Sequence, residues 1–206
     1  MKDEHDWEKY LACMEELKRR TQIVRDALIP YWTKQDVSVP NIELACLQLR
    51  KMYELVAFAA LAAHKPRYQE IRKKFEKDWK LPEIIRRINS INPGFLPVAF
   101  EDVDGNIKEL EDRRFTPNDI IKWHAEFGSI LHAFNPYKPQ PDYRSVADLC
   151  GSHIDRFTST LSRHKVNVIR GEVFYLVTMQ SDTDGSTQVA TFYNVEGALI
   201  KKHRKP

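Results

Sequence analysis

Apolar side chains are densest in the stretch from Ser38 to His64, and its second half, Leu55 to Ala63, contains no polar side chain. The stretch begins close to Pro40, a residue well suited to the first turn of a helix. A helix that is apolar on all sides must be buried on all sides, so other elements have to surround it. The pattern therefore predicts the central helix of a helical bundle.

The first half of this helix carries a polar stripe. At 100° per residue, Glu43, Arg50 and Glu54 fall within about 40° of one another. The stripe is either the solvated face of the first turns or one wall of a polar site.

Five further segments have the hydrophobic spacing of helices. Residues 5–29 form a heptad-like seam that predicts packing along another helix, and Pro30 is expected to end it. The seam consists of Trp7, Tyr10, Met14, Leu17, Val24 and Leu28. The other four are an amphipathic surface helix over 67–80, a short helix over 83–91, a helix from Pro117 to about Phe134 that Thr116 caps, and a helix that starts at the capping box Ser145-x-x-Asp148.

Two regions have the alternating pattern of strands. Asp104-Gly105 between two such runs predicts a β-hairpin, and the runs 166–169, 172–180 and 187–195 predict a three-stranded antiparallel meander. The expected fold is mainly α. It comprises a bundle of about six helices over 1–165 with a hairpin insertion at about 96–112, a β-meander appendage over 166–198 and a basic tail over 199–206.

Composition narrows the class of protein. The chain has 206 residues, of which 42% are apolar and 30% charged, as in ordinary globular proteins. Its longest wholly apolar run has nine residues, whereas a bilayer span needs about 20. The acidic N-terminal residues lack the apolar core of a signal peptide. We therefore expect a cytoplasmic protein with no membrane contact.

The three cysteines, Cys13, Cys46 and Cys150, lie far apart in helical patterns. This spacing favours reduced core residues over a disulfide framework or a metal site. No Gly-rich phosphate loop, nucleophile elbow or paired-cysteine motif is present, so we expect neither a cofactor nor a bound metal.

The net charge of +3 has a local origin, because Lys201, Lys202, Arg204 and Lys205 lie together at the end of the sequence. Such a cluster attracts phosphate and makes these residues candidates for RNA binding. The alternative is an ordinary solvated terminus.

Residues that could carry chemistry lie on the helix predicted from Pro117. Ile120, His124, Gly128 and His132 form one i, i+4 row. In the functional interpretation the row lines a cleft in which His132 acts as a general acid or base and His124 contacts RNA. In the structural interpretation Gly128 permits a close helix crossing, and the histidines bond to backbone or carboxylate groups. The two histidines are eight positions apart, unlike the i, i+4 pair of a helical zinc site.

The segment Gly128-Ser-Ile-Leu-His132-Ala-Phe-Asn135-Pro136 resembles a Gly-x-x-Leu-His-Ala-x-Asn-Pro segment of uncharacterised bacterial proteins and, more distantly, the HEPN superfamily of helical bundles. In that superfamily an Arg four to six residues before a His near a helix end forms a metal-independent ribonuclease site, which is usually assembled across a dimer. The resemblance implies a setting in phage defence or toxin–antitoxin systems. His132 matches the family's His, but Glu126 stands at the expected Arg position, so Arg50 is the candidate for the missing cation.

Two functional hypotheses follow, and whether the chain is an enzyme stays open. The favoured one is a non-catalytic helical interaction module, a homo-oligomer or a subunit of a defence complex, that meets its partner through the heptad-like seam or a strand edge. The alternative is a HEPN-like ribonuclease or RNA-binding protein. In that case His132 is the acid or base, Arg50 or the basic tail holds phosphate, and Asn135 orients the scissile group.

Overall fold

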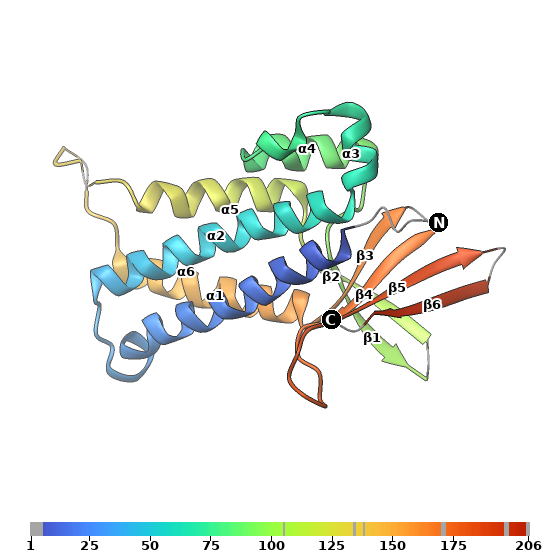
Figure 1. Cartoon of the computed structure of the whole chain (residues 1–206). Coiled ribbons are helices and arrows are strands. Elements are labelled where there is room, and N and C mark those ends of the chain that lie inside the picture. The colour runs from blue at the N-terminus through green and yellow to red at the C-terminus, as the bar shows by residue number, and fades with distance from the viewer. Residues whose placement is uncertain are drawn as a thin grey trace.

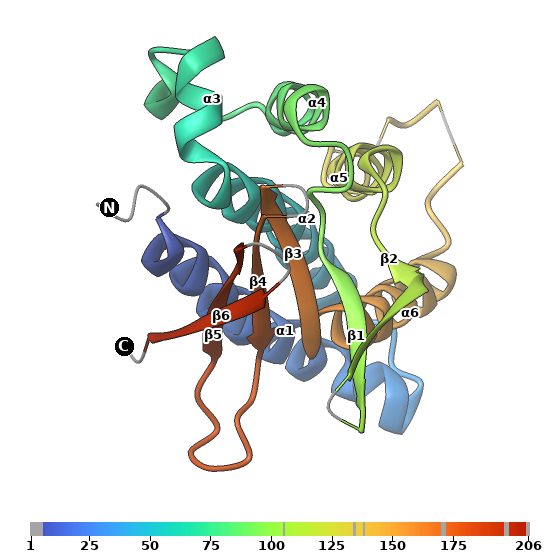
Figure 2. The same cartoon turned by 90° about the vertical axis from the view of Figure 1, so that its right-hand side faces the viewer.

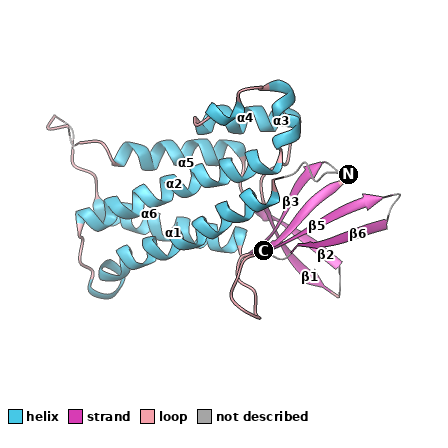
Figure 3. Ribbon diagram, viewed as in Figure 1, coloured by secondary structure: helices cyan, strands magenta, loops and turns pink. Residues whose placement is uncertain are grey.

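Helices fill one side of the molecule and a β-sheet closes one end of it (Figure 1, Figure 3). The computed structural model describes residues 6–104, 106–133, 135–137, 139–169, 172–195 and 198–204, and only the backbone of residues 195 and 198–204. The helices are α1 (Trp7–Lys34), α2 (Val39–Ala63), α3 (Lys65–Ile71), the 3-10 turn η1 (Phe75–Lys77), α4 (Leu81–Ile91), α5 (Pro117–Ile130) and α6 (Tyr143–Leu161). The strands are β1 (Val98–Val103), β2 (Asn106–Arg114), β3 (Arg163–Ile169), β4 (Val173–Thr178), β5 (Gln188–Val195) and β6 (Ala198–Arg204).

The central helix is confirmed. Helix α2 is contacted by α1, α3, α4, α5 and α6, and Figure 2 shows the ends of α1, α2 and α6 behind the sheet. Its apolar second half is largely buried, with Ala57 and Ala63 fully inaccessible, but Leu55, Phe58 and Ala62 are only half-buried. Cys46 on α2 and Cys150 on α6 meet in this core with their Sγ atoms 3.6 Å apart, and both are free thiols.

The prediction of a mainly α fold with a separate hairpin and a three-stranded meander is wrong. All strands of the described residues form one six-stranded antiparallel sheet in the order β2-β1-β3-β4-β5-β6, which makes the fold mixed α and β. The hairpin β1–β2 is joined to the C-terminal strands where Val98 lies opposite Lys165 and Ala99 opposite His164. Each group of strands has an edge with unpaired backbone groups, and joining the two edges satisfies both.

The residues expected to form a basic tail continue this sheet. Ala198–Arg204 form β6, which pairs with β5 so that Lys201 lies opposite Phe192 and Lys202 opposite Thr191. Lys205 lies outside the described residues. The prediction of a tail over 199–206 is thus corrected, because the open edge of β5 supplies backbone partners that a tail would lack.

Three helices end or break at positions that differ from expectation. Helix α1 continues through Pro30 to Lys34. The helix predicted over 67–80 is broken at Arg72, so that α3 ends at Ile71 and only a 3-10 turn follows. Helix α5 ends at Ile130 instead of continuing to about Phe134. The break at Arg72 coincides with hydrogen bonds from Arg72 and Tyr68 to the Asp78 carboxylate.

Buried polar bonds join the helices to the sheet. His164 on β3 contacts Tyr10 on α1, with 2.7 Å between its Nε2 and the tyrosine hydroxyl. At the end of α4, the Asn92 side chain donates to the carbonyl of Asn167 on β3 at 2.7 Å and lies 2.7 Å from His64 Nε2. These bonds fix how the two parts of the molecule pack.

Candidate functional site

Two predicted site residues, Arg50 and His124, do come together. Glu54 on α2 joins them, because its Oε1 lies 2.9 Å from His124 Nε2 and 3.5 Å from Arg50 Nε. The hydrogen bond from His124, together with its charge and that of Arg50, holds the pKa of the Glu54 carboxyl below its ordinary value despite partial burial. The polar stripe of the central helix is therefore a cross-helix contact between α2 and α5.

Gly128 provides the space for this contact. A Cβ atom at this position would lie 3.1 Å from Nη1 of Arg50, whose guanidinium covers the glycine. His124 is bonded to a carboxylate beside this close approach, which matches the structural interpretation of the histidine row.

The other two proposed catalytic residues lie elsewhere. Helix α5 ends before His132, which is exposed on the turn that follows it. Asn135 is exposed in the connection to α6, where its side chain accepts a hydrogen bond from the Tyr137 backbone at 3.0 Å. The predicted helical row from His124 to His132 is thus interrupted, and the described contacts do not join His132 to Arg50.

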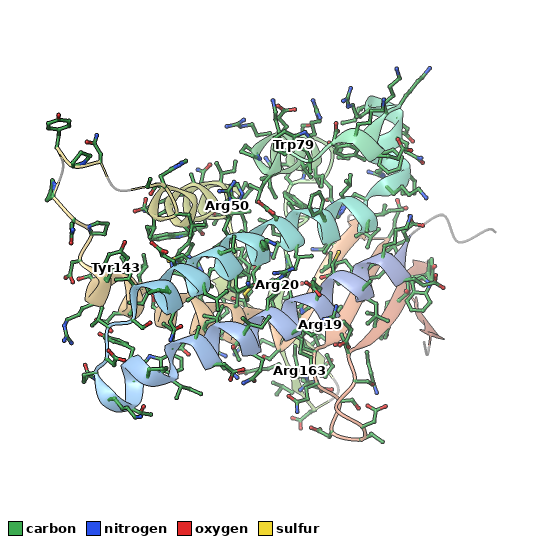
Figure 4. All side chains as sticks on the ribbon, turned by 60° about the vertical axis from the view of Figure 1, so that its left-hand side comes forward. Arg19, Arg20, Arg50, Trp79, Tyr143 and Arg163 are labelled. Carbon is green, nitrogen blue, oxygen red and sulfur yellow. The ribbon has the colours of Figure 1, made fainter. Side chains whose placement is uncertain are left out.

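A cleft that sequence reasoning missed lies between α1, the last turn of α6 and the connection from β4 to β5. Its volume is about 910 Å³, within the range of about 300–1,000 Å³ for ligand sites. Its floor is apolar, formed by Met52 and Phe157 among others. Its cationic side chains are Lys18, Arg19 and Arg25 on α1 and Arg163 at the start of β3. Figure 4 shows Arg19 on α1 and Arg163 near the sheet below it.

The cationic side chains of the cleft differ in the groups to which they are bonded. Arg19 forms an ion pair with Glu16, and Lys18 donates to the carbonyl of Gly185. Arg25 donates to the Thr158 hydroxyl at 3.2 Å, and the Arg163 guanidinium lies 5.0 Å from the centre of the Phe100 ring. Within the described part of the chain, neither Arg25 nor Arg163 has a carboxylate at ion-pairing distance. These two guanidinium groups retain most of their capacity to bind an anion.

The walls of the cleft are fixed by hydrogen bonds to the connection between β4 and β5. Glu15 on α1 accepts a hydrogen bond from the Thr187 backbone at 3.0 Å. At the other end, the Met179 backbone donates to the carbonyl of Ser162 at 2.9 Å. The connection is therefore held in place on both sides, and the cleft is preformed.

Part of this site has a sequence signal. Lys18, Gln22 and Arg25 recur at helical spacing on the side of α1 that borders the seam, which indicates one polar strip. Nothing local indicates that Arg163, more than 130 positions later, faces it. That placement depends on the position and direction in which α6 ends and β3 begins.

The remaining buried histidines are structural. His153 lies among Tyr53, Trp123 and Phe127, with 2.6 Å between its Nδ1 and the Tyr53 hydroxyl. Burial lowers the pKa of His153 to about 4. It is therefore neutral near pH 7 and is enclosed by aromatic rings.

Comparisons of the chain with protein-family models, with curated proteins and with solved structures found no match. Among the described residues, no group of three His, Cys, Asp or Glu side chains is arranged to hold a metal ion. No helix in the described part of the chain is long and apolar enough to cross a membrane.

Proposed function

We propose that the chain binds a phosphate-bearing ligand of the nucleotide class in the cleft between α1, α6 and the β4–β5 connection. The ligand is either a free nucleotide or the phosphorylated end of an RNA strand, since both present the same chemistry. The observation that carries the proposal is that Arg25 and Arg163 line one preformed cleft without a carboxylate partner among the described residues.

The chemistry of the cleft supports this ligand class. A guanidinium group donates several N–H bonds in a planar fork that matches phosphate oxygens. Met179, which also lines the cleft and is half-buried, offers apolar surface for a base. Hydroxyl groups of Thr21, Thr158 and Ser181 also line the cleft and suit a sugar.

This proposal develops the RNA-binding hypothesis without its catalytic part. A ribonuclease site at His132 needs a cation beside the imidazole, and the described contacts of Arg50 are with Glu54 and Gly128 instead. Helix α5 ends at Ile130, so His132 lies on the turn that follows the helix.

The interaction-module hypothesis stays a prediction. The seam of α1 that was expected to meet a partner is buried against α2 of the same chain, with Met14 fully inaccessible. The edge strand β2 has six charged residues among its nine, and charged edges disfavour strand pairing between molecules. Neither feature gives this hypothesis the support that the cleft gives to ligand binding.

Isothermal titration with AMP, UMP and adenosine tests the proposal. We expect saturable binding of the two nucleotides and much weaker binding of adenosine, which lacks the phosphate. Arg25→Gln and Arg163→Gln should each weaken nucleotide binding about tenfold or more, because each removes a charge-assisted hydrogen bond. Arg113→Gln, an exposed arginine on β2, is the matched control and should change nothing.

A second pair of ligands separates the two sources of phosphate. A short RNA with a 5′-phosphate, compared with the same RNA ending in a 5′-hydroxyl, shows whether a strand end occupies the cleft. Equal binding of both, with tight AMP binding, assigns the cleft to free nucleotides. Absence of saturable binding for every phosphate-bearing ligand, or equal weakening by Arg113→Gln, would contradict the proposal.

A further inference from the structure

The segment from Lys65 to Lys80, far from the cleft in the fold, is strongly cationic. It contains seven Lys or Arg residues and three Asp or Glu residues. Lys73, Lys74, Lys77 and Lys80 are all exposed. The positive charge of the body of the protein is thus concentrated on the projection formed by α3, η1 and the start of α4 (Figure 1).

This projection carries a large exposed aromatic ring. Trp79 is 71% exposed, more than any other tryptophan of the chain, and Figure 4 shows it beside α4 on the outside of the helical layer. Lys80 Nζ lies 6.0 Å from the centre of its ring. The indole face is therefore accessible to a ligand beside several cationic side chains.

The backbone that carries the ring is anchored by the residue before it. The Asp78 carboxylate, only 5% exposed, accepts hydrogen bonds from the Tyr68 hydroxyl at 2.8 Å, from Arg72 Nε at 2.9 Å and from Arg87 Nη1 at 2.8 Å. Burial raises the pKa of this carboxyl, but the hydrogen bonds and charges outweigh burial and hold the pKa below its ordinary value. The charged carboxylate therefore fixes the backbone immediately before Trp79.

The arginines and lysines of the projection have separate roles. Arg72 and Arg87 bind Asp78 and so are committed to structure. The exposed lysines remain available at the surface, although Lys80 also lies 3.5 Å from Glu83. Lysine contacts phosphates as a mobile point charge, which suits a flexible polyanion whose sequence is not read.

We propose that this surface, defined as Trp79 with Lys73, Lys74, Lys77 and Lys80, binds single-stranded nucleic acid. Trp79 stacks on a base while the lysines contact neighbouring phosphates, the combination typical of binding without sequence preference. The bonds of Asp78 fix the backbone before Trp79, which lowers the entropy lost on binding. The inference does not depend on the cleft, which lies elsewhere and takes its ligand through arginines.

Intrinsic tryptophan fluorescence of the full chain tests the inference, with a 12-nucleotide oligo-uridine as the probe. Stacking on Trp79 should quench the emission as the oligonucleotide is added. Trp79→Leu keeps an apolar side chain but removes the stacking surface, and it should weaken binding about fivefold or more in an anisotropy assay with labelled oligonucleotide. Trp32→Leu, 44% exposed at the far end of α1, is the matched control and should leave binding unchanged.

The lysines are tested through the salt dependence of the same binding. Replacing Lys73, Lys74 and Lys77 with Gln should lower the slope of log K against log salt by about 2, because each lost phosphate contact lowers it by roughly 0.7 for single strands. A control with Lys108→Gln and Arg113→Gln on β2 should keep the slope. Circular dichroism of each variant confirms that the fold is retained.

Several results would overturn the inference. One is binding by Trp79→Leu as tight as that of the unchanged chain, and another is a slope unaffected by the three lysine replacements. Capture by vesicles containing phosphatidylserine, without oligonucleotide binding, would assign the surface to membranes instead. Titration of AMP into Trp79→Leu separates the two proposals, since cleft binding should be intact whatever happens at Trp79.

Discussion

His164 illustrates at the scale of one residue how burial controls charge. Its Nδ1 donates to the carbonyl of Leu161 at 2.8 Å, so the Tyr10 hydroxyl donates to Nε2 at 2.7 Å. The ring is fully buried, and burial lowers the pKa of His164 to about 4. A neutral imidazole is thus built into the joint between α1 and the sheet.

We expect this residue to make the free energy of unfolding depend on pH. Between about pH 6.5 and 4 the unfolded chain binds a proton at His164 that the folded chain does not, so stability falls as the pH falls through this window. The loss from one such group is about 3 kcal/mol at most. Urea unfolding at pH 7, 5.5 and 4.5 measures it. His164→Asn should reduce the slope in this window, with the His153 contribution remaining, and an unchanged slope would contradict the assignment.

The candidate sites show which functional residues can be recognised from the sequence and which cannot. Arg50 and His124 could be singled out because their helices were predicted and their side chains broke an apolar pattern. Their partnership through Glu54 was not predictable, because it depends on how closely α5 crosses α2 at Gly128. Trp79 could not be recognised, since a helical pattern over 67–80 assigns its ring to a buried face.

At the scale of elements, helix beginnings were predicted better than helix ends. Thr116 and Asp119 form the expected capping box, with hydrogen bonds of 3.1 and 3.2 Å. The cap of α6 instead lies three residues earlier than predicted, because Asp142 accepts hydrogen bonds from the Arg144 backbone at 3.0 Å and from the Ser145 hydroxyl at 2.6 Å. Two polar residues competed for one cap, and the sequence does not show which one prevails.

The competition predicts opposite effects of two substitutions. Asp142→Ala should lower the free energy of unfolding by about 1 kcal/mol, the usual cost of losing an N-cap. Ser145→Ala should be neutral or slightly stabilising, because it loses one exposed hydroxyl bond and gains helix propensity inside the first turn. Thermal unfolding of both variants, with Thr116→Ala as a reference cap, checks the order. A larger loss for Ser145→Ala would mean that the helix starts where the sequence pattern places it.

At the scale of the whole molecule, the sequence indicated the strands but not their assembly. The hairpin and the C-terminal strands each had a local signal, whereas the pairing of Val98 with Lys165 joins residues 67 positions apart. Such pairing follows from the packing of the intervening helices, which no local pattern encodes. Joining the strands into one sheet also joins segments that the sequence had assigned to separate units.

One sheet shared by both regions predicts one cooperative unfolding transition. Asn92 bonds to both His64 and β3, so disruption of the helices should remove support from the sheet at the same time. Calorimetry should give a calorimetric enthalpy equal to the van't Hoff enthalpy. Asn92→Ala should lower the single midpoint by removing a buried hydrogen-bonding group worth about 1–3 kcal/mol. Two resolved transitions, with only one shifted by Asn92→Ala, would instead support a helical unit over 1–165 and an independent β appendage. The effect of Asn92→Ala on the unfolding transitions therefore shows whether the chain unfolds as one cooperative unit or as two.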